Sequence, residues 1–114
     1  MKRVLIVDNS VLLRLSLKYL FENIGFEVAG EADNGLTAVK LYKDLKPDVV
    51  TMDISMPELD GIEALKMIKT IDKDARIIII SALGHELKVK EAISAGAIAF
   101  IEKPFVEDTI LNSS

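Results

Sequence analysis

Three short apolar runs constrain the fold of this chain more than any other feature of its sequence. They are Val4–Val7, Val49–Met52 and Ile77–Ile80, and only Thr51 interrupts their apolar character. A strand with one face in water alternates between apolar and polar residues, whereas a continuous apolar run indicates a strand that is covered on both faces. These runs therefore predict a central parallel sheet with helices packed on both of its faces.

The remaining pattern predicts how the strands are connected. Weaker strand candidates are Val28–Ala32 and Ala99–Ile101, and helical patterns fall at Val11–Asn23, Leu36–Leu45, Ile62–Ile71 and Glu86–Ala95, with a short fifth helix at Val106–Leu111. Regular alternation with short, right-handed connections predicts an α/β fold with a doubly wound five-stranded parallel sheet. The flavodoxin-like strand order 2-1-3-4-5 satisfies these rules, and it places a ligand crevice at the carboxyl ends of strands 1 and 3.

Composition excludes several classes of function. With 114 residues, of which 50% are hydrophobic, the chain is expected to form one domain over residues 1–114. The net charge of -4, without a basic block, argues against nucleic-acid binding. The absence of cysteine excludes thiolate catalysis, and a single histidine leaves little for a zinc site. No apolar run approaches the ~20 residues of a membrane span, and the N-terminus does not have the layout of a signal peptide, so a cytoplasmic protein without membrane contact is expected.

Polar residues follow the predicted strands at the point where each strand ends. Strand 1 ends at Asp8 and Asn9, strand 3 at Asp53, strand 4 at Ser81 and strand 5 at Lys103. Because the carboxyl ends of parallel strands meet at one edge, these side chains are expected to converge. The carboxylates could hold Mg²⁺, and Asp53 could then attack phosphorus to form an acyl phosphate. Lys103 and Ser81 would contact the phosphoryl oxygens.

Four segments of the sequence resemble the receiver domain of two-component response regulators, most closely its single-domain chemotaxis regulator type. They are "KRVLIVDNS", "EADNGLTAVKLYKDLKPDVVTMDISMPELDGIEAL", "IIIISALG" and "EAISAGAIAFIEKPF". The resemblance implies that Asp53 is the phosphoacceptor, that Asp8 belongs to an acidic Mg²⁺ cluster and that the Ser55 carbonyl is a metal ligand. It also implies that Lys103 binds the phosphoryl group, and that the switch residues are Ser81 and Phe100.

The same resemblance implies the partners. A histidine kinase would donate the phosphoryl group, and the phosphorylated surface would bind a downstream protein target or an output domain. Such a domain is not an enzyme acting on other molecules, because it catalyses only its own phosphorylation and dephosphorylation.

One position departs from the family pattern. The sequence reads "VDNS" where the family usually has two adjacent acids, so Asn9 stands in place of the second acid. A carboxamide oxygen can still bind Mg²⁺, but it brings one less negative charge. The alternative function is therefore a pseudo-receiver, a protein-interaction module with weak or no phosphorylation. A flavin or nucleotide carrier is disfavoured, because the first loop has no glycine-rich phosphate cradle.

Simpler roles compete with several of these assignments. Asp53 could be a solvated loop acid. Asp8 could be no more than the cap of the first helix, and Asn9 no more than a cap or turn residue. Ser81 could be an ordinary strand-end hydroxyl and Lys103 a surface charge, and for Phe100 the most economical role is a core residue. A short fifth helix would also leave one sheet face thinly covered, which predicts a homodimer.

Overall fold

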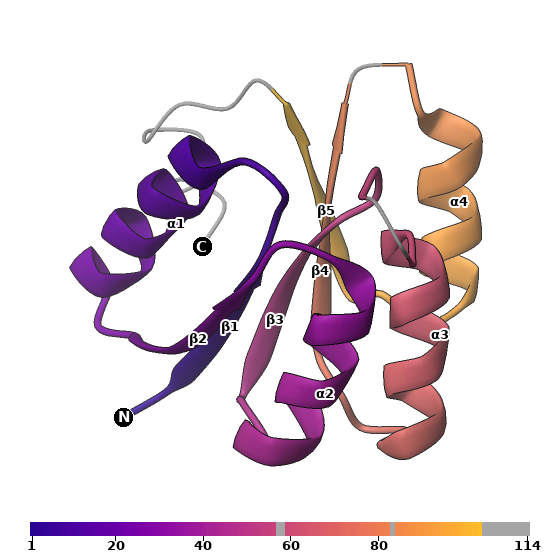
Figure 1. Cartoon of the computed structure of the whole chain (residues 1–114). Helices are drawn as coiled ribbons and strands as arrows, with labels where there is room; N and C mark the ends of the chain where they lie inside the picture. Colours follow the sequence, from indigo (N-terminus) through magenta and orange to yellow (C-terminus); the bar gives the residue numbers. More distant parts are fainter. Residues whose placement is uncertain (57–58, 83, 104–114) are drawn as a thin grey trace.

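The computed structural model describes residues 1–56, 59–82 and 84–103, and these residues form a three-layer α/β structure (Figure 1). Along the chain the elements are β1 (Arg3–Val7), α1 (Val11–Asn23), β2 (Glu27–Ala32), α2 (Gly35–Leu45), β3 (Val49–Asp53), α3 (Gly61–Ile71), β4 (Ile77–Ala82), α4 (Glu86–Ser94) and β5 (Ala99–Lys103). The strands form one parallel sheet in the order β2-β1-β3-β4-β5, which confirms the predicted fold class and strand order. The predicted fifth helix falls on residues 106–111, outside the described ranges.

The sheet is buried on both faces, as its apolar runs predict. Along β1, Leu5 and Val7 face a large core cluster shared with α2 and α3, while Val4 and Ile6 face a second cluster that includes Leu17 of α1. The four β1 side chains are all 0% exposed. Figure 1 shows α1 on one side of the sheet and α2, α3 and α4 on the other. Two-sided burial therefore explains why β1 is apolar at every one of these positions.

Side-chain caps fix where three of the helices begin. Ser10, Asn34 and Asp60 each accept a hydrogen bond from the backbone N–H three residues ahead, at the starts of α1, α2 and α3. Such caps satisfy N–H groups that the helix itself leaves unpaired. Because Ser10 is the residue that caps α1, the interpretation of Asp8 as a helix cap is wrong, and its carboxylate is available for another role.

Three of the strands extend further than their apolar runs. β3 includes Asp53, β4 includes Ser81, and β5 runs to Lys103. In the register, Asp53 is opposite Ile80, Ser81 is opposite Glu102, and Ala82 is opposite Lys103. The sheet ladder thus fixes the backbone of these polar residues at one edge. Within the described residues, no helix is long and apolar enough to cross a membrane.

Candidate functional site

Two buried carboxylates meet one ammonium group at the carboxyl edge of the sheet. Asp8 is 0% exposed and Asp53 is 3% exposed. The Nζ atom of Lys103 lies 3.4 Å from Oδ2 of Asp8 and 3.3 Å from Oδ2 of Asp53. Charged side chains are rarely buried unless they are paired, so this cluster is a strong indication of a functional site.

Asp8 is held by both its backbone and its side chain. Its N–H donates to the Ala32 carbonyl on β2 at 3.0 Å, and its own carbonyl accepts a hydrogen bond from Nη1 of Arg14 at 2.7 Å. The Oδ1 atom accepts a hydrogen bond from the N–H of Ser10 at 2.9 Å. The buried Oδ2 atom accepts no hydrogen bond from the described residues, and Lys103 is its charged neighbour. This oxygen therefore has unused capacity to bind a cation.

The start of α3 packs against the backbone of Asp53 and holds it in position. A Cβ atom added to Gly61 would collide with the Asp53 carbonyl, so only glycine allows the helix to begin this close to the strand end. The Gly61 N–H donates to the Ile54 carbonyl at 2.8 Å, which ties the intervening loop to the helix. The Oδ1 atom of Asp53 accepts a hydrogen bond from the N–H of Ser55 at 3.3 Å. The aspartate is thus fixed with its carboxylate toward Lys103 and Asp8.

The electrostatics of the cluster favour a bound cation. Burial raises the pKa of Asp53, the neighbouring Asp8 carboxylate raises this pKa further, and Lys103 partly offsets both effects. With both acids ionised and Lys103 protonated, the three side chains carry a net charge of about -1 in a largely buried place. A divalent cation with oxygen ligands would relieve that repulsion.

The other predicted site residues lie around this cluster. Ser81 is 1% exposed on β4, next to the residue that pairs with Lys103. Asn9 and Ser55 are exposed at the ends of β1 and β3. They flank the two carboxylates in the chain, so the edge also carries a carboxamide beside the acids. The sheet therefore brings the predicted polar residues to one edge.

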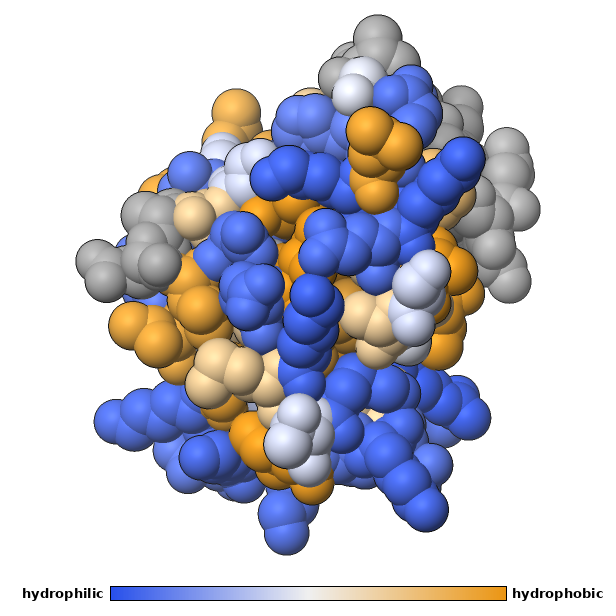
Figure 2. Space-filling view, turned by 90° about the vertical axis from the view of Figure 1, so that its right-hand side faces the viewer, coloured by the Kyte–Doolittle hydropathy of each residue, from blue (hydrophilic) through white to orange (hydrophobic). Residues whose placement is uncertain are grey.

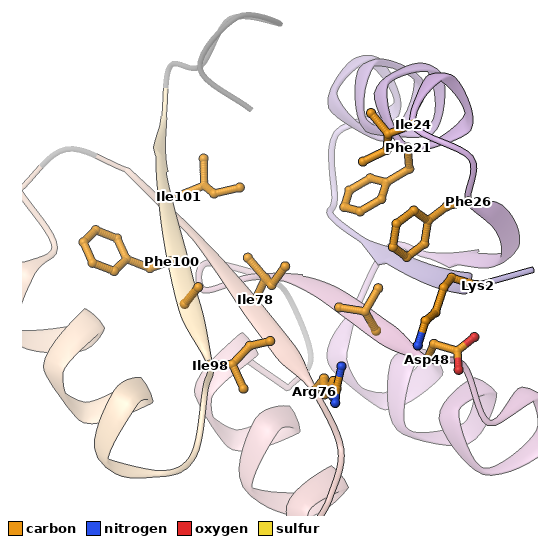
Figure 3. A pocket seen from close by; sticks show the side chains of 12 residues that line it. Lys2, Phe21, Ile24, Phe26, Asp48, Arg76, Ile78, Ile98, Phe100 and Ile101 are labelled. Carbon is orange, nitrogen blue, oxygen red and sulfur yellow. The ribbon is translucent and has the colours of Figure 1, made fainter. Parts of the chain in front are cut away.

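Phe100 is the exception, and its interpretation as a core residue is wrong. Its side chain is 51% exposed. Figure 3 shows it on the opposite side of β5 from Ile101. The physical reason is that β5 is an edge strand, and successive side chains of a strand point to opposite faces.

The residues present fit a Mg²⁺ ion, with fewer charges than a three-acid site would have. Mg²⁺ prefers oxygen ligands and usually binds one or two carboxylates while retaining several waters. Asp8 and Asp53 supply the carboxylates, and the Oδ2 atom of Asp8, which is paired with Lys103 but accepts no hydrogen bond from the described residues, supplies an acceptor. Among the described residues there is no group of three acidic, histidine or cysteine side chains that could hold a metal. This is consistent with an amide, Asn9, beside the acids.

Two further residues support the site, although the sequence predicts no site role for either of them. Arg14 holds the Asp8 carbonyl, and Gly61 makes room for the Asp53 backbone. The signal for Gly61 is its place directly after Asp60, a helix-capping residue, in a loop that follows a strand. Arg14 has a weaker signal, because only the fold brings it beside Glu31 of β2.

Comparison with known proteins identifies the family to which this geometry belongs. The family model described as "Response regulator receiver domain" matches residues 4–113. The chain belongs to the response regulator receiver family. Receiver domains are the phosphoacceptor domains of two-component signalling, which makes this a signalling domain and not an enzyme that acts on other substrates.

Named relatives support the same assignment. The chemotaxis protein CheY of Thermotoga maritima is 54% identical over 112 residues, which are 98% of this chain and 93% of the relative. The CheY protein of Bacillus subtilis is 53% identical over 97% of this chain and 92% of its own length. Among solved structures, the CheX-CheY-BeF3-Mg complex from Borrelia burgdorferi matches with a TM-score of 0.93 and 43% identity, over 97% of this chain and 84% of that one.

Proposed function

We propose that residues 1–114 form a single receiver domain in which Asp53 accepts a phosphoryl group. The observation that carries this proposal is the contact of Lys103 with both buried carboxylates. One Asp53 oxygen attacks the phosphorus of a phosphohistidine on a kinase. The new P–O bond gives an acyl phosphate, the P–N bond breaks, and its electron pair stays with the imidazole nitrogen, which then takes up a proton. Carboxylate attack requires no general base, because Asp53 is already ionised when it reacts.

Asp8, Asn9, Asp53 and the carbonyl of Ser55 are the groups that would hold Mg²⁺ in this domain. When bound, Mg²⁺ supplies positive charge that offsets the repulsion between Asp53 and the incoming phosphoryl group. The buried Oδ2 atom of Asp8, which accepts no hydrogen bond from the described residues, supports this assignment. The Borrelia relative, whose complex contains Mg, supports it independently.

Lys103 and Ser81 act on the phosphoryl group itself. The Lys103 ammonium is a point charge that can leave Asp53 for a phosphoryl oxygen, because both lie at the same edge. The Ser81 hydroxyl is buried on the neighbouring strand and can donate a second hydrogen bond. Movement of Ser81 toward the phosphoryl group would open space beside β5, and Phe100, now exposed, is the residue that would fill it. This coupling would change the partner-binding surface.

The partners follow from the same chemistry. A histidine kinase is the proposed phosphodonor, and a downstream protein target or output domain is the proposed recipient of the signal. The named relatives are chemotaxis proteins, so chemotaxis is the proposed setting. A cytoplasmic location remains a prediction of the sequence. No observation on the described residues favours the pseudo-receiver alternative.

Phosphoryl labelling tests this function directly. The chain is incubated with Mg²⁺ and acetyl phosphate or phosphoramidate, and intact-mass spectrometry detects the phosphoryl increment. We expect labelling of the native chain and none of Asp53→Ala. Asp48→Ala is a matched control, because Asp48 is an exposed aspartate just before the opposite end of the same strand. Full labelling of Asp53→Ala would refute the phosphoacceptor assignment, and a native chain that is never labelled would favour the pseudo-receiver.

A further inference from the structure

We propose that Arg14 is a positioning residue for the metal site, and that Glu31 holds Arg14 in place. This inference rests on the Mg²⁺ site proposed above and assigns the part of the protein that orients it. Arg14 touches neither the phosphoacceptor nor, in the proposal, the ion. Its action is on the backbone that carries Asp8 and Asn9.

The contacts of Arg14 define this role. Its guanidinium donates from Nη1 to the Asp8 carbonyl at 2.7 Å and from Nε to Oε1 of Glu31 at 3.2 Å. The arginine side chain is only 16% exposed, and that of Glu31 is 36% exposed. One planar group therefore bridges the end of β1 to the end of β2, using two donors in a fixed relation. A short hydrogen bond to a charged donor is among the stronger hydrogen bonds in proteins.

The Asp8 carbonyl belongs to the peptide unit that joins Asp8 to Asn9. Because a peptide unit is planar, fixing this oxygen fixes the orientation of the Asn9 N–H and the position of the Asn9 Cα atom, from which its side chain starts. The Asp8 N–H is already bound to the Ala32 carbonyl on the other side. Arg14 thus completes the restraint on the residue pair that would hold the ion.

Such a restraint matters more here because Asn9 is a weak ligand. A carboxylate attracts Mg²⁺ over a distance and can adjust to it, whereas a carboxamide gains less from binding and depends on correct placement. Asn9 is exposed. Its position therefore depends on the backbone that Arg14 holds.

Glu31 also neutralises the positive charge of Arg14 near the proposed cation site. A guanidinium beside a cation site repels the cation, and this repulsion is substantial at short range. The Glu31 carboxylate pairs with the guanidinium and neutralises it. Arg14 can therefore serve as a hydrogen-bond donor near the ion without opposing its binding.

The molecule contains a matched control for this arrangement. At the opposite end of the same two strands, Arg3 donates from Nη1 to the Leu45 carbonyl at 2.7 Å, and its Nε atom lies 3.6 Å from Glu27. This second arginine also contacts a backbone carbonyl and a carboxylate, although its carboxylate contact is a longer ion pair, and it lies at the far end of β1 from Asp8. Arg3→Met therefore removes one backbone hydrogen bond and one ion pair without touching the proposed metal site.

The test compares Mg²⁺ affinity with stability in the full chain. The chain has no tryptophan, so the Kd for Mg²⁺ is measured by isothermal titration calorimetry, and the metal-free Tm by circular dichroism. We expect Arg14→Met to raise the Kd about tenfold, a typical cost of removing an outer-shell partner. Arg14→Lys should recover part of this loss, because its ammonium can still donate to the Asp8 carbonyl. Arg3→Met should lower the Tm but leave the Kd unchanged.

Glu31→Gln separates the charge effect from the positioning effect. With Arg14 present, this variant should weaken Mg²⁺ binding because it leaves the guanidinium charge uncompensated. In the Arg14→Met background it should have no further effect, which a double-mutant cycle detects as strong coupling. The amide resonance of Asn9 in the metal-free protein provides a second measurement. It should shift in Arg14→Met and stay unchanged in Arg3→Met.

Each result supports or overturns the inference. A native Kd in folded Arg14→Met, or an equal loss in Arg3→Met, overturns it while leaving the proposed function intact. If Arg14→Met does not fold, Arg14→Lys and Glu31→Gln decide the matter, and native affinity in both overturns the inference. A native chain that binds no Mg²⁺ overturns the proposed metal site itself, and the inference with it.

Discussion

At the scale of single residues, Asp53 combines a buried position with a charge that its surroundings only partly neutralise. Because burial and Asp8 raise its pKa in the folded state above the ordinary value of 3.8, the folded protein binds this proton more tightly than the unfolded chain. The stability that the group contributes is therefore fully present below pH 3.8 and is lost as the pH rises through the raised pKa. At neutral pH, the ionised Asp53 destabilises the metal-free fold. The residue that carries the function thus has a cost in stability.

Asp53→Asn should consequently stabilise the metal-free protein at pH 7, because it removes the buried charge and retains the shape. The gain should shrink as the pH falls toward 3.8, where the native carboxyl also becomes neutral. Urea unfolding with EDTA at several pH values measures the free energy of unfolding for both proteins. Asp48→Asn is the control at an exposed position. A variant less stable than the native chain at pH 7 would contradict this account.

For Asn9 the predicted change in metal-free stability is opposite to that of Asp53→Asn, because the substitution adds a charge. Asn9→Asp restores a third formal negative charge, so it should tighten Mg²⁺ binding and lower the metal-free Tm. A unit charge ~4 Å away is worth about 4 kcal/mol at an effective dielectric constant near 20, and solvation offsets much of this. Because Asn9 is exposed, we expect a gain in affinity of about tenfold. Calorimetry and thermal unfolding of both variants measure the two effects. Equal Mg²⁺ affinities would show that position 9 does not contact the ion.

At the scale of helices and strands, the phosphoacceptor depends on how closely α3 approaches β3. Gly61→Ala should destabilise the protein by about 1–3 kcal/mol, because the added methyl group has no room beside the Asp53 carbonyl. The sign is diagnostic, since alanine at an unhindered helical position is stabilising. The variant should also slow labelling by acetyl phosphate, because the clash displaces Asp53.

Gly25→Ala is the control for this prediction. A Cβ atom at Gly25 meets no neighbouring atom, although its positive φ of +94 makes alanine strained there. This variant should lose stability and retain its labelling rate. A native labelling rate in Gly61→Ala would show that the close approach does not position Asp53.

Helices and strands could be predicted from the sequence, whereas the positions of some side chains could not. The apolar run of β1 has a direct physical cause, because both of its faces are buried, and α1 was predicted with its observed bounds. The convergence of Asp8 and Asp53 followed from strand polarity. Phe100 was misjudged because its exposure depends on β5 lying at the edge of the sheet. Arg14 was missed because a contact between α1 and β2 has no local pattern in the sequence.

At the scale of the whole molecule, apolar side chains are distributed unevenly over the surface of the described residues. The side that carries α3 and α4 is mostly hydrophilic, with apolar residues scattered among polar ones (Figure 2). A groove of about 300 Å³ instead lies between the end of α1 and β5 (Figure 3). Its apolar lining includes Phe21, Ile24, Phe26, Ile78, Ile98 and Ile101. An apolar surface of this kind is the feature that the sequence-based prediction of a homodimer requires.

Self-association through this groove is the prediction for the intact chain. Ile98 is 56% exposed at its rim, so Ile98→Lys would place a charge in the contact without disturbing the core. Leu87 of α4 is 82% exposed and does not line the groove, which makes Leu87→Lys the matched control for a lost apolar group and an added charge. Sedimentation velocity over a range of concentrations should show a growing dimer fraction for the native chain and for Leu87→Lys, and a monomer for Ile98→Lys. A native chain that stays monomeric at high concentration would contradict the homodimer, and equal dimerisation of Ile98→Lys would place its contact outside the groove.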